Sequence, residues 1–94
     1  MSTSFAIEPR IASVTALPGH RLSVSFRDGS ARLYDFTPHL SHDVFSLLKN
    51  AAFFSAVQID TSGYALVWND DMDIAASELW LNGQPVNTSI EQEF

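Results

Sequence analysis

The sequence predicts a small α+β domain, in which an antiparallel sheet of about four to five strands carries two to three short helices on one face. Polar and apolar residues alternate around Asp28-Gly29 between residues 21 and 36, a pattern typical of a β-hairpin. Apolar residues then recur at helical spacing after Ser41. The chain has 94 residues, of which 46% are hydrophobic and 17% charged, as expected for one folded domain.

The first half of the chain predicts three strands. Residues 10–17 alternate around Val14, and Pro18-Gly19 then favours a turn in which Gly19 takes a positive φ. The hairpin 21–36 is expected at the centre of the sheet. With Asp28-Gly29 as a two-residue loop, Phe26 would face Ala31 and Val24 would face Leu33. This register predicts an apolar face and an opposite, wetter face that carries Arg27, Arg32 and Tyr34.

The middle of the chain predicts a helix over residues 41–49, with Ser41 as its N-cap. An α-helical period places three apolar residues in one stripe toward the sheet: Val44, Leu47 and Leu48. Asn50 is expected to cap a second, shorter helical turn that carries two phenylalanines.

The second half predicts a strand pair over residues 57–60 and 64–68, an acidic turn over 69–73, and a last helix over 75–82. Gly83 is the expected end of that helix. The predicted domain therefore spans residues 10–83. Residues 1–9 are expected to form a loose leader and residues 84–94 a mobile tail.

The net charge of −6 argues against binding to nucleic acid by this chain alone, and against an anionic membrane surface. The chain has only five basic residues. It has no cysteine, which excludes disulfides, thiolate metal sites and a cysteine nucleophile. No apolar run approaches the ~20 residues that span a bilayer. We therefore expect a cytoplasmic protein without a cofactor.

Two groups of residues would suit a metal ion. Clustered carboxylates bind Ca²⁺ or Mg²⁺, and Asp70, Asp71 and Asp73 are such a group. The EF-hand pattern does not fit, because Ile74 and Trp80 stand where that loop needs Gly and Glu. His39 and His42 would need a third ligand to hold zinc. Divalent-metal or small-ligand binding is thus the alternative function.

No motif predicts catalysis. The four glycines are scattered, so there is neither a phosphate-binding loop nor a Gly-x-Ser-x-Gly elbow. Tyr and Arg are enriched in binding hot spots. The predicted wetter face with Arg27, Arg32 and Tyr34 is therefore the candidate partner surface, and the predicted function is non-enzymatic interaction with a second copy or a small protein partner.

Several segments resemble the family catalogued as domain of unknown function 2442. They are Val14-x-Ala16-Leu17-Pro18-Gly19, Asp28-Gly29-Ser30, Tyr34-Asp35-Phe36, Phe53-Phe54-x-x-Val57, Trp68, Asp73-Ile74 and Glu78-Leu79-Trp80. The family's Trp-Pro-Asn-Gly-Ile-Asp stretch is replaced here by residues 68–73, which lack its Pro and Gly.

The resemblance implies a small bacterial α+β protein with an antiparallel sheet and no established activity. Some relatives carry an added helix-turn-helix domain, and some are encoded beside small toxin-like partners. The resemblance therefore implies a regulatory, antitoxin-like interaction module.

Overall fold

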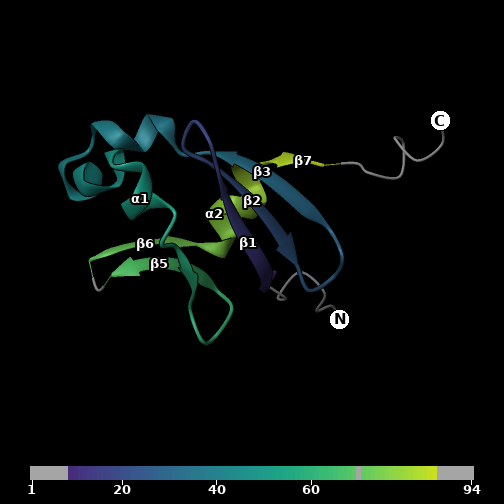
Figure 1. Cartoon of the computed structure of the whole chain (residues 1–94). Helices are drawn as coiled ribbons and strands as arrows, with labels where there is room; N and C mark the ends of the chain where they lie inside the picture. The colour runs from purple at the N-terminus through teal and green to yellow at the C-terminus, as the bar shows by residue number, and fades with distance from the viewer. Residues whose placement is uncertain (1–8, 70, 87–94) are drawn as a thin grey trace.

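The computed structural model describes residues 9–69 and 71–86, which form two antiparallel sheets. The larger sheet has the order β1-β2-β3-β7, with β1 at Ile11–Leu17, β2 at Arg21–Phe26, β3 at Ala31–Asp35 and β7 at Gln84–Pro85. The smaller has the order β4-β5-β6, with β4 at Gln58–Ile59, β5 at Ala65–Asn69 and β6 at Met72–Ala75. The predicted α+β class is confirmed (Figure 1).

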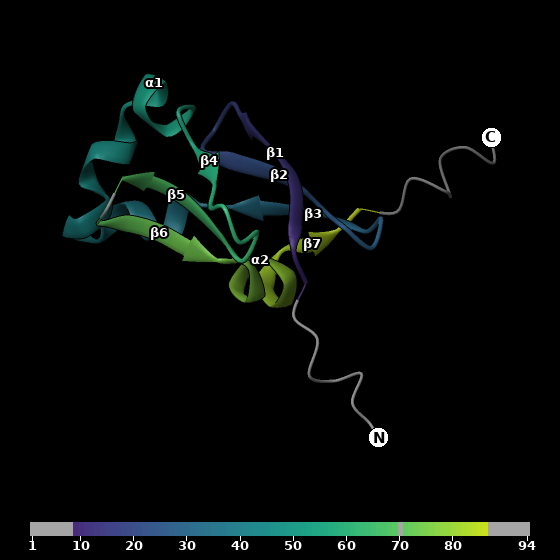
Figure 2. The ribbon, with the colours of Figure 1, turned by 90° about the horizontal axis from the view of Figure 1, so that it is seen from below.

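Four helical segments complete the fold. They are the 3₁₀ segments η2 (Thr37–Ser41) and η3 (Asp43–Lys49) and the α-helices α1 (Ala51–Phe54) and α2 (Ala76–Asn82). In Figure 1, the first three gather at one end of the molecule. The helix α2 contacts both β3 and β6, so it joins the two sheets (Figure 2).

One hydrophobic core lies between these elements. Its members come from both sheets, η3 and the two α-helices: Ile11, Leu22, Val24, Phe26, Tyr34, Phe36, Leu48, Phe54, Leu66, Met72, Ile74, Ala76 and Leu79. Phe36, which follows β3, has no exposed surface and lies at the aromatic centre of the core. Its ring contacts the rings of Phe45, Phe54 and Trp68 at centroid distances of 5.1, 5.6 and 5.2 Å.

The predicted hairpin register is wrong by one residue. Val24 pairs with Arg32 rather than Leu33, and Leu22 pairs with Tyr34. The N–H of Phe26 donates to Ser30 O at 2.8 Å, so the loop has three residues and ends at Gly29 with a φ of 94°. Three-residue loops of this kind combine a turn with a left-handed residue. Because side chains alternate along a strand, the slip moves Arg32 and Tyr34 to the core-facing side.

Replacing Gly29 with Ala should lower the free energy of unfolding by about 1–2 kcal/mol, because a Cβ disfavours left-handed backbone. A Cβ at Gly29 would meet no atom within 4 Å, so the loss would come from backbone strain alone. Urea denaturation measures the change. Gly29→Asn is the matched control, since Asn tolerates the left-handed region, and it should lose less. Equal losses in both variants would contradict this account of the turn.

The predicted helix over residues 41–49 is also corrected. Ser41 ends η2 instead of capping a helix, and η3 is a 3₁₀ helix that follows His42. A 3₁₀ helix has 3.0 residues per turn, so residues three apart lie on the same side. Val44 and Leu47 therefore share one side, which is exposed, whereas Phe45 and Leu48 share the side that faces the core.

The remaining elements are largely as predicted. Asn50 caps α1 through a hydrogen bond from the N–H of Phe53 to Asn50 Oδ1 at 3.1 Å. The helix α2 begins one residue later than expected, and Gly83 follows it. Two strands were not predicted: β6 includes Asp73 of the expected acidic turn, and β7 takes Gln84 and Pro85 from the expected tail to pair with β3. Residues 1–8 and 87–94, which hold the rest of the predicted leader and tail, lie outside the described residues.

Candidate interaction surface

Tyr34 anchors a polar cluster rather than a partner surface. Its side chain is only 4% exposed. The hydroxyl donates to Glu78 Oε2 at 2.8 Å, and His39 Nε2 lies 2.7 Å from the same oxygen. Since the hydroxyl proton is directed to the carboxylate, Nε2 of His39 carries the proton that bonds the Tyr34 oxygen. Asn82 Nδ2 donates to Glu78 Oε1 at 2.9 Å. The cluster thus ties β3 to η2 and α2.

Burial raises the pKa of the Tyr34 hydroxyl above its ordinary value of 10, and the hydrogen bond to Glu78 raises this pKa further. A phenolate at this position would lose solvation and would face the Glu78 carboxylate. The hydroxyl therefore stays protonated at neutral pH. It acts as a structural hydrogen-bond donor and not as a nucleophile.

Arg32, the second predicted partner residue, is half-buried and bound within the domain. Its guanidinium lies 4.2 Å from the centroid of the Trp80 ring. Its Nε donates to Trp80 O at 3.1 Å, and its Nη1 donates to Ala31 O at 3.1 Å. These contacts pack the side chain between β3 and α2. The structure therefore does not bring Arg32 and Tyr34 together with Arg27 on one exposed face.

Arg27 remains exposed, at the end of β2. Its main-chain N–H donates to Arg10 O at 2.8 Å, so the two arginines are neighbours where β1 begins and β2 ends. The guanidinium of Arg10 lies 4.8 Å from the centroid of the Tyr64 ring. Arg27 is thus part of a corner formed by the start of β1, the end of β2 and the loop before β5.

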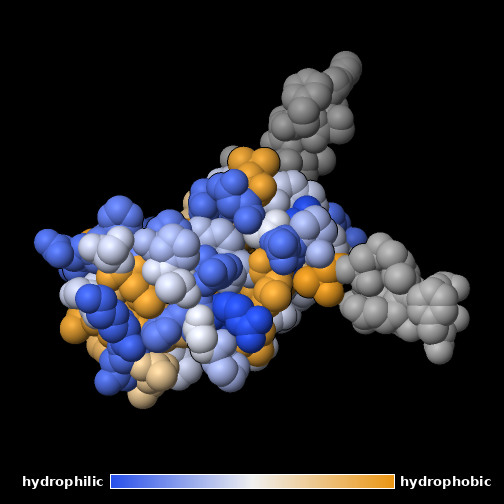
Figure 3. Space-filling view, turned by 90° about the horizontal axis from the view of Figure 1, so that it is seen from above, coloured by the Kyte–Doolittle hydropathy of each residue, from blue (hydrophilic) through white to orange (hydrophobic). Residues whose placement is uncertain are grey.

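The most exposed large apolar side chains of the helical end are Val44 and Leu47 on η3, which are 52% and 55% exposed. Phe53 of α1 is also partly exposed. Figure 3 shows hydrophobic side chains at the end of the molecule that carries η2, η3 and α1. We call Val44 and Leu47 the η3 surface. The sequence pattern missed this surface because an α-helical period assigns both residues to the core.

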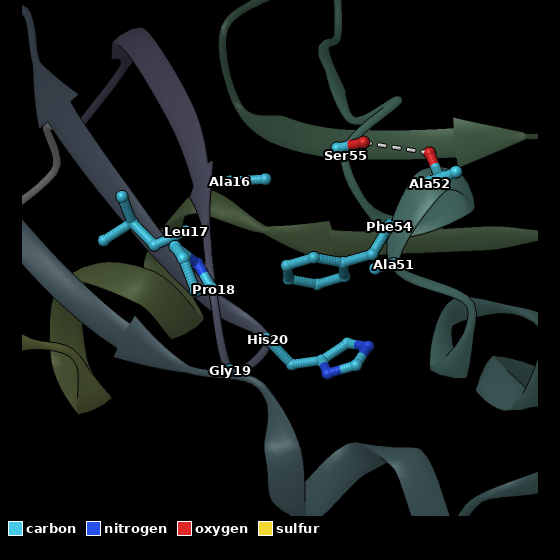
Figure 4. Close-up of a pocket in the computed structure, with 9 residues that line it drawn as sticks. All are labelled: Ala16, Leu17, Pro18, Gly19, His20, Ala51, Ala52, Phe54 and Ser55. Carbon is cyan, nitrogen blue, oxygen red and sulfur yellow. Dashed lines mark hydrogen bonds between the residues drawn. The ribbon is translucent and has the colours of Figure 1, made fainter.

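A groove of about 400 Å³ lies between the β1–β2 turn and α1 (Figure 4). His20 lines it, with a positive φ of 58°. Its Nε2 lies 2.8 Å from Leu48 O, and its ring packs on Phe54 with a centroid distance of 4.9 Å. The Ser55 hydroxyl donates to Ala52 O at 3.0 Å, on the far side of the Phe54 ring from His20 in Figure 4. The groove is lined mainly by apolar side chains and presents no Ser–His pair.

The predicted acidic metal site is only partly described. Asp71 and Asp73 are exposed, and Asp70 lies outside the described residues. The Asn69 side chain organises this turn, because Asn69 Oδ1 accepts from the N–H groups of Asp71 and Met72 at 2.8 and 3.0 Å. Within residues 9–69 and 71–86, no group of three or more His, Cys, Asp or Glu side chains is placed to hold a metal ion.

The fold and surface define a small α+β domain with an apolar helical end. Residues 11–85 match the family model described as "Protein of unknown function (DUF2442)", so the chain belongs to this family, as the resemblance indicated. Neither the curated proteins nor the solved structures include a significant match. In the described part of the chain, no helix has the length and apolar character needed to cross a membrane.

Proposed function

We propose that this protein is a non-enzymatic protein–protein interaction module that binds its partner through the η3 surface. The observation that carries the proposal is the pairing of Val44 and Leu47 on one side of η3, where each of these aliphatic side chains leaves more than half of its surface in water. Covering such side chains contributes roughly 25 cal/mol per Å² of buried apolar area. A regulatory, antitoxin-like role is the form of this function that the family resemblance suggests.

The polar groups of the domain support a binding role over catalysis. The Tyr34 hydroxyl bonds both His39 and Glu78 inside the fold, which stabilises the packing of three elements. Among the residues that line the described groove, His20 is the one titratable side chain, whereas general acid–base chemistry uses positioned groups beside a substrate. The η3 surface, by contrast, is available to a partner as it stands.

Replacing Val44 and Leu47 together with Ser should weaken partner binding at least tenfold, because truncation of buried interface anchors commonly costs more than about 1 kcal/mol each. A second copy of this chain is the simplest partner, since most oligomers are symmetric homodimers. Sedimentation equilibrium measures the self-association constant of the wild type and the variant. If the wild type is monomeric, the same pair of proteins is compared for recovery of a host partner.

Leu81→Ser is the matched control. Leu81 lies on α2 and is 75% exposed, so Leu81→Ser removes the same kind of apolar surface from a different element. It should leave binding unchanged. Equal weakening by Leu81→Ser and by the η3 variant, with both proteins folded by circular dichroism, would show that η3 is not the interface.

A further inference from the structure

Two arginine side chains converge on one glycine at the corner between the sheets. A Cβ built on Gly63 would lie 3.4 Å from Arg27 Nη2, 3.4 Å from Arg10 Cβ and 3.7 Å from Arg10 Cδ. The two side chains therefore pack over the same point of the loop before β5. Gly63 has a φ of 84° and is buried beneath them, so both its backbone conformation and its lack of a side chain suit this packing.

Main-chain hydrogen bonds hold the corner in place. The Ile11 N–H donates to Gly63 O at 2.8 Å, which fastens the loop to β1. The Arg27 N–H donates to Arg10 O at 2.8 Å, which joins β1 to β2 beside it. On the far side, the Ala76 N–H donates to Tyr64 O at 2.7 Å. The two guanidinium groups are thus carried by a backbone that is fixed before any partner arrives, which reduces the ordering cost of binding.

The corner brings two positive charges together in an acidic protein. Arg10 and Arg27 are two of only five basic residues in a chain of net charge −6. Asp28, which follows Arg27, is engaged locally, because its Oδ1 accepts from the N–H and the hydroxyl of Ser30 at 2.9 and 2.6 Å. Asp60, the acidic residue of the adjoining loop, is engaged locally: its Oδ2 accepts from the N–H and the hydroxyl of Ser62 at 3.1 and 2.5 Å. These hydrogen bonds lower the pKa of Asp60 and hold its carboxylate in the turn.

The Tyr64 ring orients one of the two cations. Arg10 places its guanidinium 4.8 Å from the ring centroid, within the range of a cation–π contact. A guanidinium on an aromatic face keeps its five N–H donors, whose fork matches the two oxygens of a carboxylate. We call Arg10, Arg27 and Tyr64, together with Gly63 below them, the arginine corner.

We propose that the arginine corner binds a carboxylate side chain in an acidic segment of the partner protein. This inference rests on the proposed function and names the chemistry that the partner brings. Carboxylate is the expected anion rather than the phosphate of a nucleic acid, because a polyanion would meet the net charge of −6 over the rest of the surface, whereas a short acidic segment needs only the corner. An apolar contact at η3 and a charged contact here would together fix the orientation of the partner.

The test uses the purified full chain and, as the probe, a blocked hexapeptide that carries a single glutamate, followed by NMR at low salt. The Nε–Hε signals of Arg10 and Arg27 should shift on titration, and the dissociation constant should rise at least fivefold in Arg27→Gln and in Arg10→Gln. Arg21→Gln is the matched control, since Arg21 lies at the other end of β2 and gives the same change in net charge. It should change the constant less than twofold.

Three outcomes would overturn the inference: no shift at either arginine, equal weakening by Arg21→Gln, or inorganic phosphate binding as tightly as the peptide with the same dependence on Arg10 and Arg27. The experiment involves neither Val44 nor Leu47. A negative result in this titration would therefore not contradict the assignment of η3 as an interface. A negative result with the η3 variants would likewise not contradict carboxylate binding at the arginine corner.

Discussion

Phe36→Ala should lower the free energy of unfolding by about 3–5 kcal/mol, which is the largest effect we expect from a single substitution. Phe36 has no exposed surface, and its ring lies among those of Phe45, Phe54 and Trp68. These rings come from η3, α1 and β5, so the cavity left by Ala would loosen the helical end from both sheets. Small domains have only about 5–15 kcal/mol of stability in total.

Urea denaturation followed by tryptophan fluorescence measures this loss, because Trp68 reports on the same cluster. Phe53→Ala is the control, since Phe53 is a neighbouring phenylalanine that remains partly exposed. It should cost less than about 1 kcal/mol. Comparable losses in the two variants would contradict the placement of Phe36 at the centre of the core.

Tyr34→Phe should lower the free energy of unfolding by about 1–3 kcal/mol, because it keeps the ring but removes the hydroxyl that joins Glu78 and His39. The carboxylate of Glu78 would then lose the Tyr34 hydroxyl as a donor and keep the side-chain amide of Asn82. Tyr64→Phe makes the same chemical change at a half-buried ring and should have a smaller effect. Chemical denaturation at neutral pH measures both variants.

The same residue predicts a pH dependence in the alkaline range. The pKa of the Tyr34 hydroxyl is raised in the folded protein above its ordinary value of 10, so the folded state holds this proton more tightly than the unfolded state. Its stabilising contribution is complete below pH 10 and declines as the pH rises from 10 toward the raised pKa. Tyr34→Phe should therefore lose less stability than the wild type between pH 10 and 11. If the free energy of unfolding falls equally with pH in the wild type and in Tyr34→Phe over this interval, the burial of an ionisable hydroxyl at Tyr34 is contradicted.

Residue types and their periods predicted the α+β class, the strands β1, β2 and β3 of the larger sheet and the helix α2. Each of these follows from local rules: alternation in β2, the turn pair Pro18-Gly19 and the stop at Gly83. The structure confirms the positive φ at Gly19. Such signals are strong because a few adjacent residues determine them.

The hairpin register was not predictable from the same rules. Asp28-Gly29 suits both a two-residue loop and a three-residue loop that ends at Gly29, and the two differ by one residue in pairing. The choice is made by tertiary packing, since the observed register buries Tyr34 against Glu78 and sets Arg32 on Trp80. Those partners lie more than 40 residues away in sequence. The candidate sites therefore lie at the η3 surface and the arginine corner and not on the predicted wetter face.

The η3 surface could not be predicted from the sequence for a related reason. The spacing of Val44, Leu47 and Leu48 fits an α-helix, and only the tighter 3₁₀ turn separates Leu48, which is buried, from the other two. Long 3₁₀ segments are uncommon, so the α-helix is the natural expectation. The arginine corner likewise depends on the packing of Gly63 against the side chains of Arg10 and Arg27, which no local sequence pattern predicts.

The most direct test of the interaction-module proposal is site-specific photo-crosslinking in cells of the source organism. A photoreactive side chain is placed at position 47 on η3 in one protein and at position 81 on α2 in another, with both proteins expressed at their natural level. The proposal predicts that the probe at 47 gives one discrete crosslinked product, either a homodimer or a complex with a small protein, and that the probe at 81 does not. A product from position 81 alone, or from neither position, would contradict the assignment of η3 as the binding surface.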